Sequence, residues 1–80
     1  MKLITLIKKI VEKTPNEICI TKNGKSLTYK EFWQLCLMFS SYINLYSSKN
    51  KIVCIYEKDN FYDYIAIVGT LISGGTYVPL

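Results

Sequence analysis

The first pattern along the chain is helical. Leu, Ile and Val recur three and four residues apart between Leu3 and Val11, with lysines on the opposite side. An amphipathic helix has this spacing, so we predict a helix from about Lys2 to Lys13. Thr14-Pro15-Asn16 ends it, because a proline disfavours the helical conformation of the residue before it.

The next segment alternates between apolar and polar residues. Glu17 to Lys22 places its two isoleucines on one face, and Lys25 to Thr28 can return beside it. Between these runs stands Asn23-Gly24, the strongest short hairpin signal, because both residues tolerate positive φ. We predict a short β-hairpin.

A long helix should follow this hairpin. Thr28-Tyr29-Lys30-Glu31 fits a capping box, in which each end residue's side chain accepts a bond from the other's backbone N–H. The helix should run to about Tyr46. Its main apolar stripe consists of Phe32, Cys36, Phe39, Ile43 and Tyr46, and Trp33, Leu35, Leu37, Met38 and Tyr42 extend the stripe nearly all round. A helix that is apolar on most sides is expected to be buried on most sides.

The remaining pattern predicts a βαβ unit. Lys51 to Glu57 contains a continuous apolar run, which suits a central parallel strand. Asp59 or Asn60 can cap a second helix from Phe61 to Ser73.

Gly74-Gly75 should end this helix in the left-handed conformation. An extended segment, Thr76 to Pro79, then completes a right-handed crossover and a parallel sheet. Gly69 would let helix and sheet approach closely. The stretch from Gly69 to Thr76 mimics a phosphate-binding P-loop in spacing, but it lacks the Lys and lies inside and at the end of a helix rather than before one.

Composition supports an α/β domain or part of one. Of 80 residues, 50% are hydrophobic and 14% aromatic, which excludes a disordered tail. A chain this short has little interior, so the apolar excess indicates tight packing or a missing neighbour. The net charge is +4, and His and Arg are both absent. Scattered lysines favour a solvated surface over a nucleic-acid groove, where Arg supplies bidentate contacts.

Three cysteines, Cys19, Cys36 and Cys54, are widely spaced among apolar residues. With neither a C-x-x-C pair nor a His, they make no zinc site. We expect small buried core side chains, reduced as in the cytoplasm. The uncharged run from Phe32 to Ser48 contains too many polar residues for a membrane span, which needs about 20 mostly apolar ones.

Catalytic candidates are few. Without His, the chain offers no imidazole base for a nucleophile. Glu31 is explained as a helix cap. Glu57 and Asp59 follow the first parallel strand, where open α/β sheets bind ligands, but capping the next helix explains Asp59 equally well. We therefore assign no catalytic, cofactor-binding or metal-binding residue.

Two segments resemble the amino-acid adenylation domains of the adenylate-forming (AMP-binding) enzymes. Ser26 to Phe32 (SLTYKEF) resembles their first core motif, L-T-Y-x-E-L, and Leu71 to Leu80 (LISGGTYVPL) resembles the second, L-K-A-G-x-A-Y-V-P-L-D. Thr14-Pro15-Asn16 and the strand after it look like the T-P-x-x-x-A-V segment that precedes them. Departures are Phe32 for Leu and Ser73 for Lys. Order and spacing match over nearly all 80 residues.

The resemblance implies an N-terminal, incomplete part of the adenylate-forming fold, with residues 1–80 forming one piece and no further domain. It implies ATP and Mg²⁺ for the parent enzyme, an aminoacyl-adenylate intermediate, and transfer of the aminoacyl group to a carrier-protein thiol. The family's phosphate loop, ribose aspartate, magnesium acid and C-terminal lysine lie later in its sequence. We therefore expect this chain alone to bind no cofactor, to be inactive, and to need the remainder of the domain as partner.

Within the superfamily, Trp33 and the short Ser47-Ser48-Lys49-Asn50 connection look similar to D-alanine–carrier-protein ligases. Peptide-synthetase and acyl-CoA-synthetase domains mostly have a longer connection. Two alternatives stay open: an acyl-CoA synthetase fragment, and a small non-catalytic interaction module or truncated remnant that docks through its apolar faces. A flavodoxin-like or nucleotide-binding domain is disfavoured because no phosphate loop is present.

Overall fold

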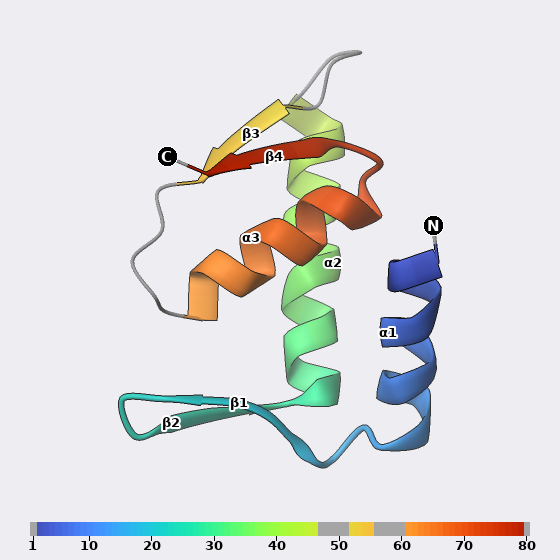
Figure 1. Ribbon diagram of the computed structural model, residues 1–80, viewed down its shortest axis with the longest axis vertical. Coiled ribbons are helices and arrows are strands. Elements are labelled where there is room, and N and C mark those ends of the chain that lie inside the picture. Colours follow the sequence, from blue (N-terminus) through green and yellow to red (C-terminus); the bar gives the residue numbers. More distant parts are fainter. Residues whose placement is uncertain (1, 47–51, 56–60, 80) are drawn as a thin grey trace.

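A computed structural model describes residues 2–46, 52–55 and 61–79 (Figure 1). Every predicted helix and strand is present within these residues. The elements in order are α1 (Lys2–Lys13), β1 (Ile18–Lys22), β2 (Lys25–Thr28), α2 (Tyr29–Tyr46), β3 (Ile52–Ile55), α3 (Phe61–Ile72) and β4 (Thr76–Pro79). The structure begins β1 one residue later than predicted, because the Glu17 N–H donates to the Thr14 carbonyl in a turn (3.3 Å).

The first two strands form the predicted antiparallel hairpin. Its register pairs Lys22 with Lys25 and Thr21 with Ser26, whose hydroxyl oxygens lie 2.9 Å apart. Asn23 has a φ of 52° and Gly24 a φ of 76°. Both values lie in the left-handed region that a two-residue hairpin turn requires.

The last three elements form the βαβ unit. β3 and β4 pair in parallel, from Ile52 opposite Thr76 to Ile55 opposite Pro79. Gly74 has a φ of 82° and donates its N–H to the Leu71 carbonyl (3.1 Å), while Gly75 donates to the Thr70 carbonyl (3.0 Å). These two bonds form a Schellman motif, so the predicted glycine end of the helix is confirmed.

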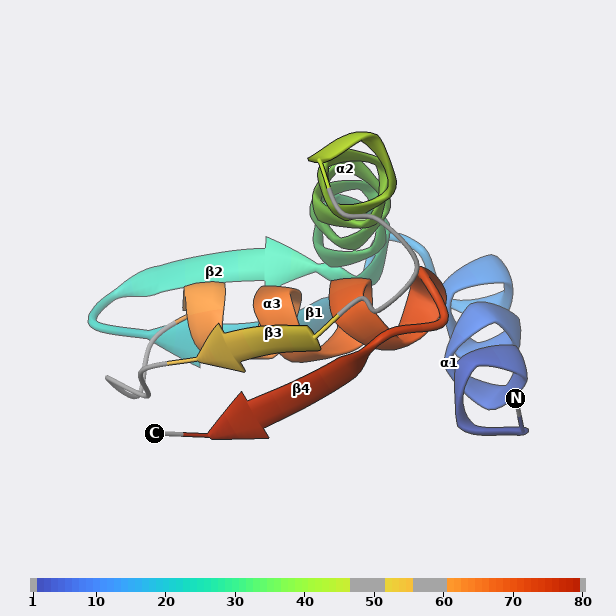
Figure 2. The same cartoon turned by 90° about the horizontal axis from the view of Figure 1, so that it is seen from above.

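The helices α2 and α3 pack directly against each other, and α3 lies between α2 and the β3–β4 pair (Figures 1 and 2). α1 stands beside this stack, and the hairpin crosses its lower end in Figure 1. Phe32 and Cys36 on α2 and Ile65 on α3 form the buried cluster at the centre.

Gly69 allows the close approach of the two helices. A Cβ at this position would lie 2.9 Å from Phe39 Cδ2 and 3.0 Å from the Cys36 carbonyl oxygen. The sequence predicted that Gly69 would face the sheet, and this was wrong. The sequence places Gly69 in a helix but does not show which element it packs against. In the structure this element is α2.

Two further predictions about burial were wrong for the residues that the structure describes. α2 is buried only on the side of Phe32, Cys36, Ser40 and Ile43, whereas Met38 and Leu45 are 68% and 74% exposed. β3 is not central, because the sheet of the described residues contains only β3 and β4, and Cys54 is exposed rather than buried. In both cases the apolar pattern is present, but no described residue covers it.

Candidate functional site

The first motif builds the joint between hairpin and long helix. The Thr28 N–H donates to Glu31 Oε1 (2.8 Å), and the Glu31 N–H donates to Thr28 Oγ1 (3.2 Å), as the predicted capping box requires. The next two free amides are also satisfied: Tyr29 donates to the Glu17 carbonyl and Lys30 to the Pro15 carbonyl, each at 2.9 Å. The motif therefore holds the segment before β1 against the start of α2, with Glu31 as its predicted cap.

The second motif ends α3 and begins β4. Thr70 and Ser73 are buried, and their hydroxyls donate to the carbonyls of Ala66 and Thr70, both at 2.6 Å. Ser73 stands where the adenylation motif usually has Lys, and its short hydroxyl side chain fits a buried helix end. The P-loop lookalike is confirmed as helix and turn, so it offers no row of free amides to a phosphate.

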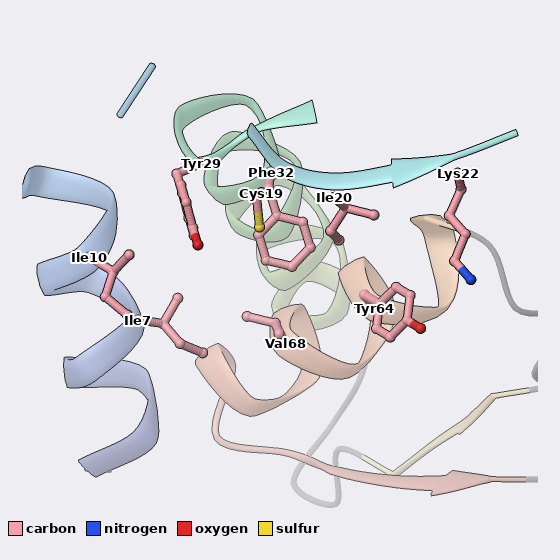
Figure 3. A pocket seen from close by; sticks show the side chains of 9 residues that line it. All are labelled: Ile7, Ile10, Cys19, Ile20, Lys22, Tyr29, Phe32, Tyr64 and Val68. Atoms are coloured by element: carbon pink, nitrogen blue, oxygen red, sulfur yellow. The ribbon is translucent and has the colours of Figure 1, made fainter. Parts of the chain in front are cut away.

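An apolar groove of about 390 Å³ lies between α1, β1 and α3. Figure 3 shows Ile7 and Ile10 on α1 facing Val68 on α3 across it, with the Cys19 sulfur and the Phe32 ring behind. Its remaining lining residues are Ile20, Lys22, Tyr29 and Tyr64. A second hollow of similar volume, between β2, α2 and α3, is lined by Lys25, Ser26, Leu27, Leu35, Tyr62 and Ile65.

The chemistry of the main groove is that of a contact surface. Among the described residues of its lining, Lys22 is the single charged one, and Tyr29 and Tyr64 contribute the only hydroxyls. Burial raises the pKa of the Cys19 thiol. Burial, together with the nearby Cys19, raises the pKa of Cys36 to about 12. Because the thiolate is the nucleophile, neither thiol is activated. As the described residues line it, the groove suits an apolar segment.

No metal centre forms among the described residues, where no three Cys, Asp or Glu side chains gather. Asp63 is buried in the first turn of α3. Glu57 and Asp59, the two candidates at the carboxyl end of β3, lie outside the described residues. Among the described helices, none is both long enough and apolar enough to cross a membrane.

The groove was not predicted from the sequence. Its lining comes from α1, β1, the start of α2 and α3, and no local pattern places these four segments together. The one signal in the sequence was the surplus of apolar residues, which indicated an uncovered surface without locating it.

The chain is similar to known proteins in both sequence and fold. No protein-family model matches the chain. The D-alanine--D-alanyl carrier protein ligase of Listeria innocua is 35% identical over 98% of the chain, and that of Lactococcus lactis is 26% identical over 100%. The chain spans 16% of the length of each of these ligases.

Solved structures show the same fold. The N-terminal subdomain of Klebsiella oxytoca NpsA matches 96% of the chain with a TM-score of 0.88 at 19% identity, and the chain covers 20% of it. NpsA-ThdA, an artificially fused adenylation-PCP di-domain NRPS from the same organism, matches with a TM-score of 0.86 at 20% identity over 96% of the chain and 15% of its own length. Sequence and fold thus agree that the chain is an N-terminal segment of an adenylation domain.

Proposed function

We propose that these 80 residues form the N-terminal part of an ATP-dependent ligase that activates an amino acid as its aminoacyl-adenylate and loads it on a carrier-protein thiol. The observation that carries the proposal is the likeness over almost the whole chain to D-alanine--D-alanyl carrier protein ligases. The fold of the NpsA subdomain supports it.

The contribution of the 80 residues to this function is structural. Both motifs are occupied in capping α2 and in ending α3. The groups that would bind ATP, Mg²⁺ and the amino acid belong to the remainder of the domain, and we treat residues 1–80 as one piece of it. The chain on its own would bind no cofactor and catalyse no adenylation.

The proposed partners are the remainder of the adenylation domain and a carrier protein. The carrier is supported by the names of the ligase relatives and of the adenylation-PCP fusion. A cytoplasmic location is supported by the free thiols of Cys19, Cys36 and Cys54, because reduced cysteines persist in that compartment.

The test is amino-acid-dependent exchange of pyrophosphate into ATP. The 80-residue chain should show none. A chimera in which it replaces the aligned segment of the Listeria innocua ligase should show exchange that depends on D-alanine, with the unaltered ligase and a reaction without amino acid as controls. Exchange by the chain alone, or a folded chimera without exchange, would contradict the proposal.

A non-catalytic interaction module is the second candidate, because a large apolar surface is uncovered in the described residues. Intact-mass spectrometry of the native product in its source cells distinguishes the two. A mass far above that of 80 residues supports the ligase. A native 80-residue product bound to a protein unrelated to adenylation domains supports the module.

A further inference from the structure

Helix α1 has two apolar sides that face in different directions. Val11 is buried and Ile7 is half-buried against the rest of the fold. Leu3, Leu6 and Ile10 follow one another at the three- and four-residue spacing that places side chains on one side of a helix, yet they are 51%, 59% and 42% exposed. α1 stands at the edge of the molecule in both views (Figures 1 and 2), and no described element covers this second side. We call Leu3, Leu6 and Ile10 the outer stripe.

The charges of α1 are placed unevenly around the outer stripe. Four of the chain's ten lysines belong to α1, whose sequence contains a single acidic residue, Glu12. Because successive residues of a helix are rotated by about 100°, Lys9 and Lys13 lie on the same side as Leu6, whereas Glu12 lies nearly opposite Ile10. Both lysines and Glu12 are exposed. Positive charge therefore borders the outer stripe, and the negative charge is on the far side of the helix.

An exposed apolar stripe bordered by lysines is the pattern of a helix that lies in the surface of an anionic membrane. The apolar side chains enter the boundary between the headgroups and the acyl chains, and lysine ammonium groups reach the lipid phosphates on their flexible stems. With 12 residues, α1 is too short to span a bilayer, which takes about 20. The outer stripe is already exposed, so docking requires no opening of the fold.

The exposed apolar face of α2 lacks this charge pattern. Met38, Tyr42 and Leu45 are exposed there, but the sequence from Phe32 to Tyr46 contains no charged residue. Attraction to anionic lipid comes from basic residues close to the membrane surface, so the outer stripe of α1 matches such a surface and the face of α2 does not. The α2 face therefore serves as a control of similar apolar character.

We propose that the outer stripe of α1, together with Lys9 and Lys13, is a docking surface for an anionic lipid bilayer, on which the helix lies parallel to the membrane plane. The inference does not depend on the proposed ligase function. It is compatible with the proposed cytoplasmic location, because the cytoplasmic leaflet of a membrane carries a negative surface potential. Docking is weak and reversible, because its strength scales with the small apolar area of one stripe and with the charge beside it.

Co-sedimentation with lipid vesicles tests the proposal. The 80-residue chain should bind vesicles of phosphatidylcholine mixed with phosphatidylglycerol, and should bind vesicles of phosphatidylcholine alone much more weakly. Raising NaCl to about 1 M, where the Debye length is about 3 Å, should weaken the binding to the anionic vesicles about tenfold or more. Equal binding to both kinds of vesicle, or binding to neither, would overturn the proposal.

A matched pair of double variants tests the stripe. Leu3→Ser combined with Leu6→Ser should weaken binding to the anionic vesicles about tenfold or more, because two apolar side chains no longer enter the bilayer. Met38→Ser combined with Leu45→Ser, on the exposed face of α2, should leave the binding unchanged. All four positions are exposed, so the thermal midpoints should change little. If the α2 variant loses as much binding as the α1 variant, the stripe is not the docking surface.

A second matched pair tests the charges. Lys9→Gln combined with Lys13→Gln should weaken the binding about tenfold or more. Lys25→Gln combined with Lys30→Gln removes the same charge at two exposed positions outside α1 and should have a much smaller effect. Equal losses from the two variants would mean that only the net charge of the chain matters, which contradicts docking through α1.

Two other occupants of the outer stripe are excluded by the same variants. A dimer in sedimentation velocity without lipid, dissociated by Leu3→Ser with Leu6→Ser, would assign the stripe to a second copy of the chain. The Listeria innocua chimera should bind the anionic vesicles as the 80-residue chain does. A folded chimera that does not bind, whether or not it catalyses exchange, would show that the remainder of the ligase covers the stripe. Either result would refute membrane docking.

A gain of signal reports insertion directly. Leu6→Trp in a Trp33→Phe background places the single tryptophan on the outer stripe. Its emission should shift to the blue on anionic vesicles and be quenched by brominated acyl chains, because the ring enters the apolar boundary. Tyr42→Trp in the same background is the control on α2, and its emission should not change. An unchanged emission of the Leu6→Trp chain when it sediments with the vesicles would contradict the proposal.

Discussion

The close packing of Gly69 on α3 against α2 gives the sharpest stability prediction. Gly69→Ala adds one methyl group where α3 crosses α2. That Cβ would lie 2.9 Å from Phe39 Cδ2, 3.0 Å from the Cys36 carbonyl oxygen and 3.1 Å from Phe39 Cβ. A ring edge can rotate away, but a backbone carbonyl and a Cβ move only with the helix, so the helices must separate.

Two opposing effects decide the magnitude. An extra methylene in a packed core costs about 1–3 kcal/mol. Replacing a helical glycine by alanine gains about 1 kcal/mol in helix propensity. Two of the three contacts are to rigid atoms, which places the cost in the upper half of its range. We therefore expect Gly69→Ala to lower the free energy of unfolding by about 1–2 kcal/mol, which for a domain of this size lowers the thermal midpoint by about 4–8 °C per kcal/mol.

Circular dichroism melts and urea titrations of the 80-residue chain provide the assay. Ser41→Ala is the control, because it gains helix propensity at an exposed position of α2 without a new core contact. It should be neutral or slightly stabilising. Phe39→Leu in the Gly69→Ala background should recover part of the loss by removing the ring contact. If Gly69→Ala is as stable as the parent chain, the close helix crossing is refuted.

Three other predictions concern local features. Thr28→Ala should cost about 1 kcal/mol by removing the hydroxyl that accepts the Glu31 N–H bond, and Glu31→Gln, which keeps an acceptor, should cost less. If Thr28→Ala left the free energy of unfolding unchanged in urea titrations, the capping box would be unimportant. Gly74→Ala should cost about 1 kcal/mol from its φ of 82° alone, since no atom lies within 4 Å of the added Cβ; no loss in a thermal melt would contradict this. Burial raises the pKa of Cys36 from 9.0 to about 12 in the folded chain, so the unfolded chain loses this proton at a lower pH. The free energy of unfolding should therefore be unaffected by this group below pH 9. Between pH 9 and 12 it should fall by up to about 1.4 kcal/mol per pH unit. A Cys36→Ala variant with the same pH slope in urea titrations would exclude that cause.

The local structure could be predicted because its signals are local. Asn23-Gly24 determined the hairpin turn and its positive φ values. Thr28 and Glu31 marked the start of α2, and Gly74 marked the end of α3. Each feature depends on backbone geometry within about four residues, which the sequence specifies directly.

The candidate groove and the partner of Gly69 depend on tertiary contacts and could not be predicted in the same way. The apolar spacing of α1 gave the helix but not the fact that Ile7 and Ile10 face Val68 across an open groove. Gly69 lies in α3, between two layers, and the pattern does not say on which layer it packs. The structure places it against Phe39 of α2 rather than on the sheet.

The two wrong burial predictions concern two separate apolar faces of the molecule. α2 carries a second apolar face, on which Met38, Tyr42 and Tyr46 are exposed and the two tyrosine rings lie 4.7 Å apart. β3 reads as an interior strand yet exposes Ile52 and Cys54. Uncovered apolar surface of this extent normally marks an interaction site. Because α3 lies between α2 and the β3–β4 pair, these two uncovered faces lie on opposite sides of the molecule, so a single covering layer could not bury both.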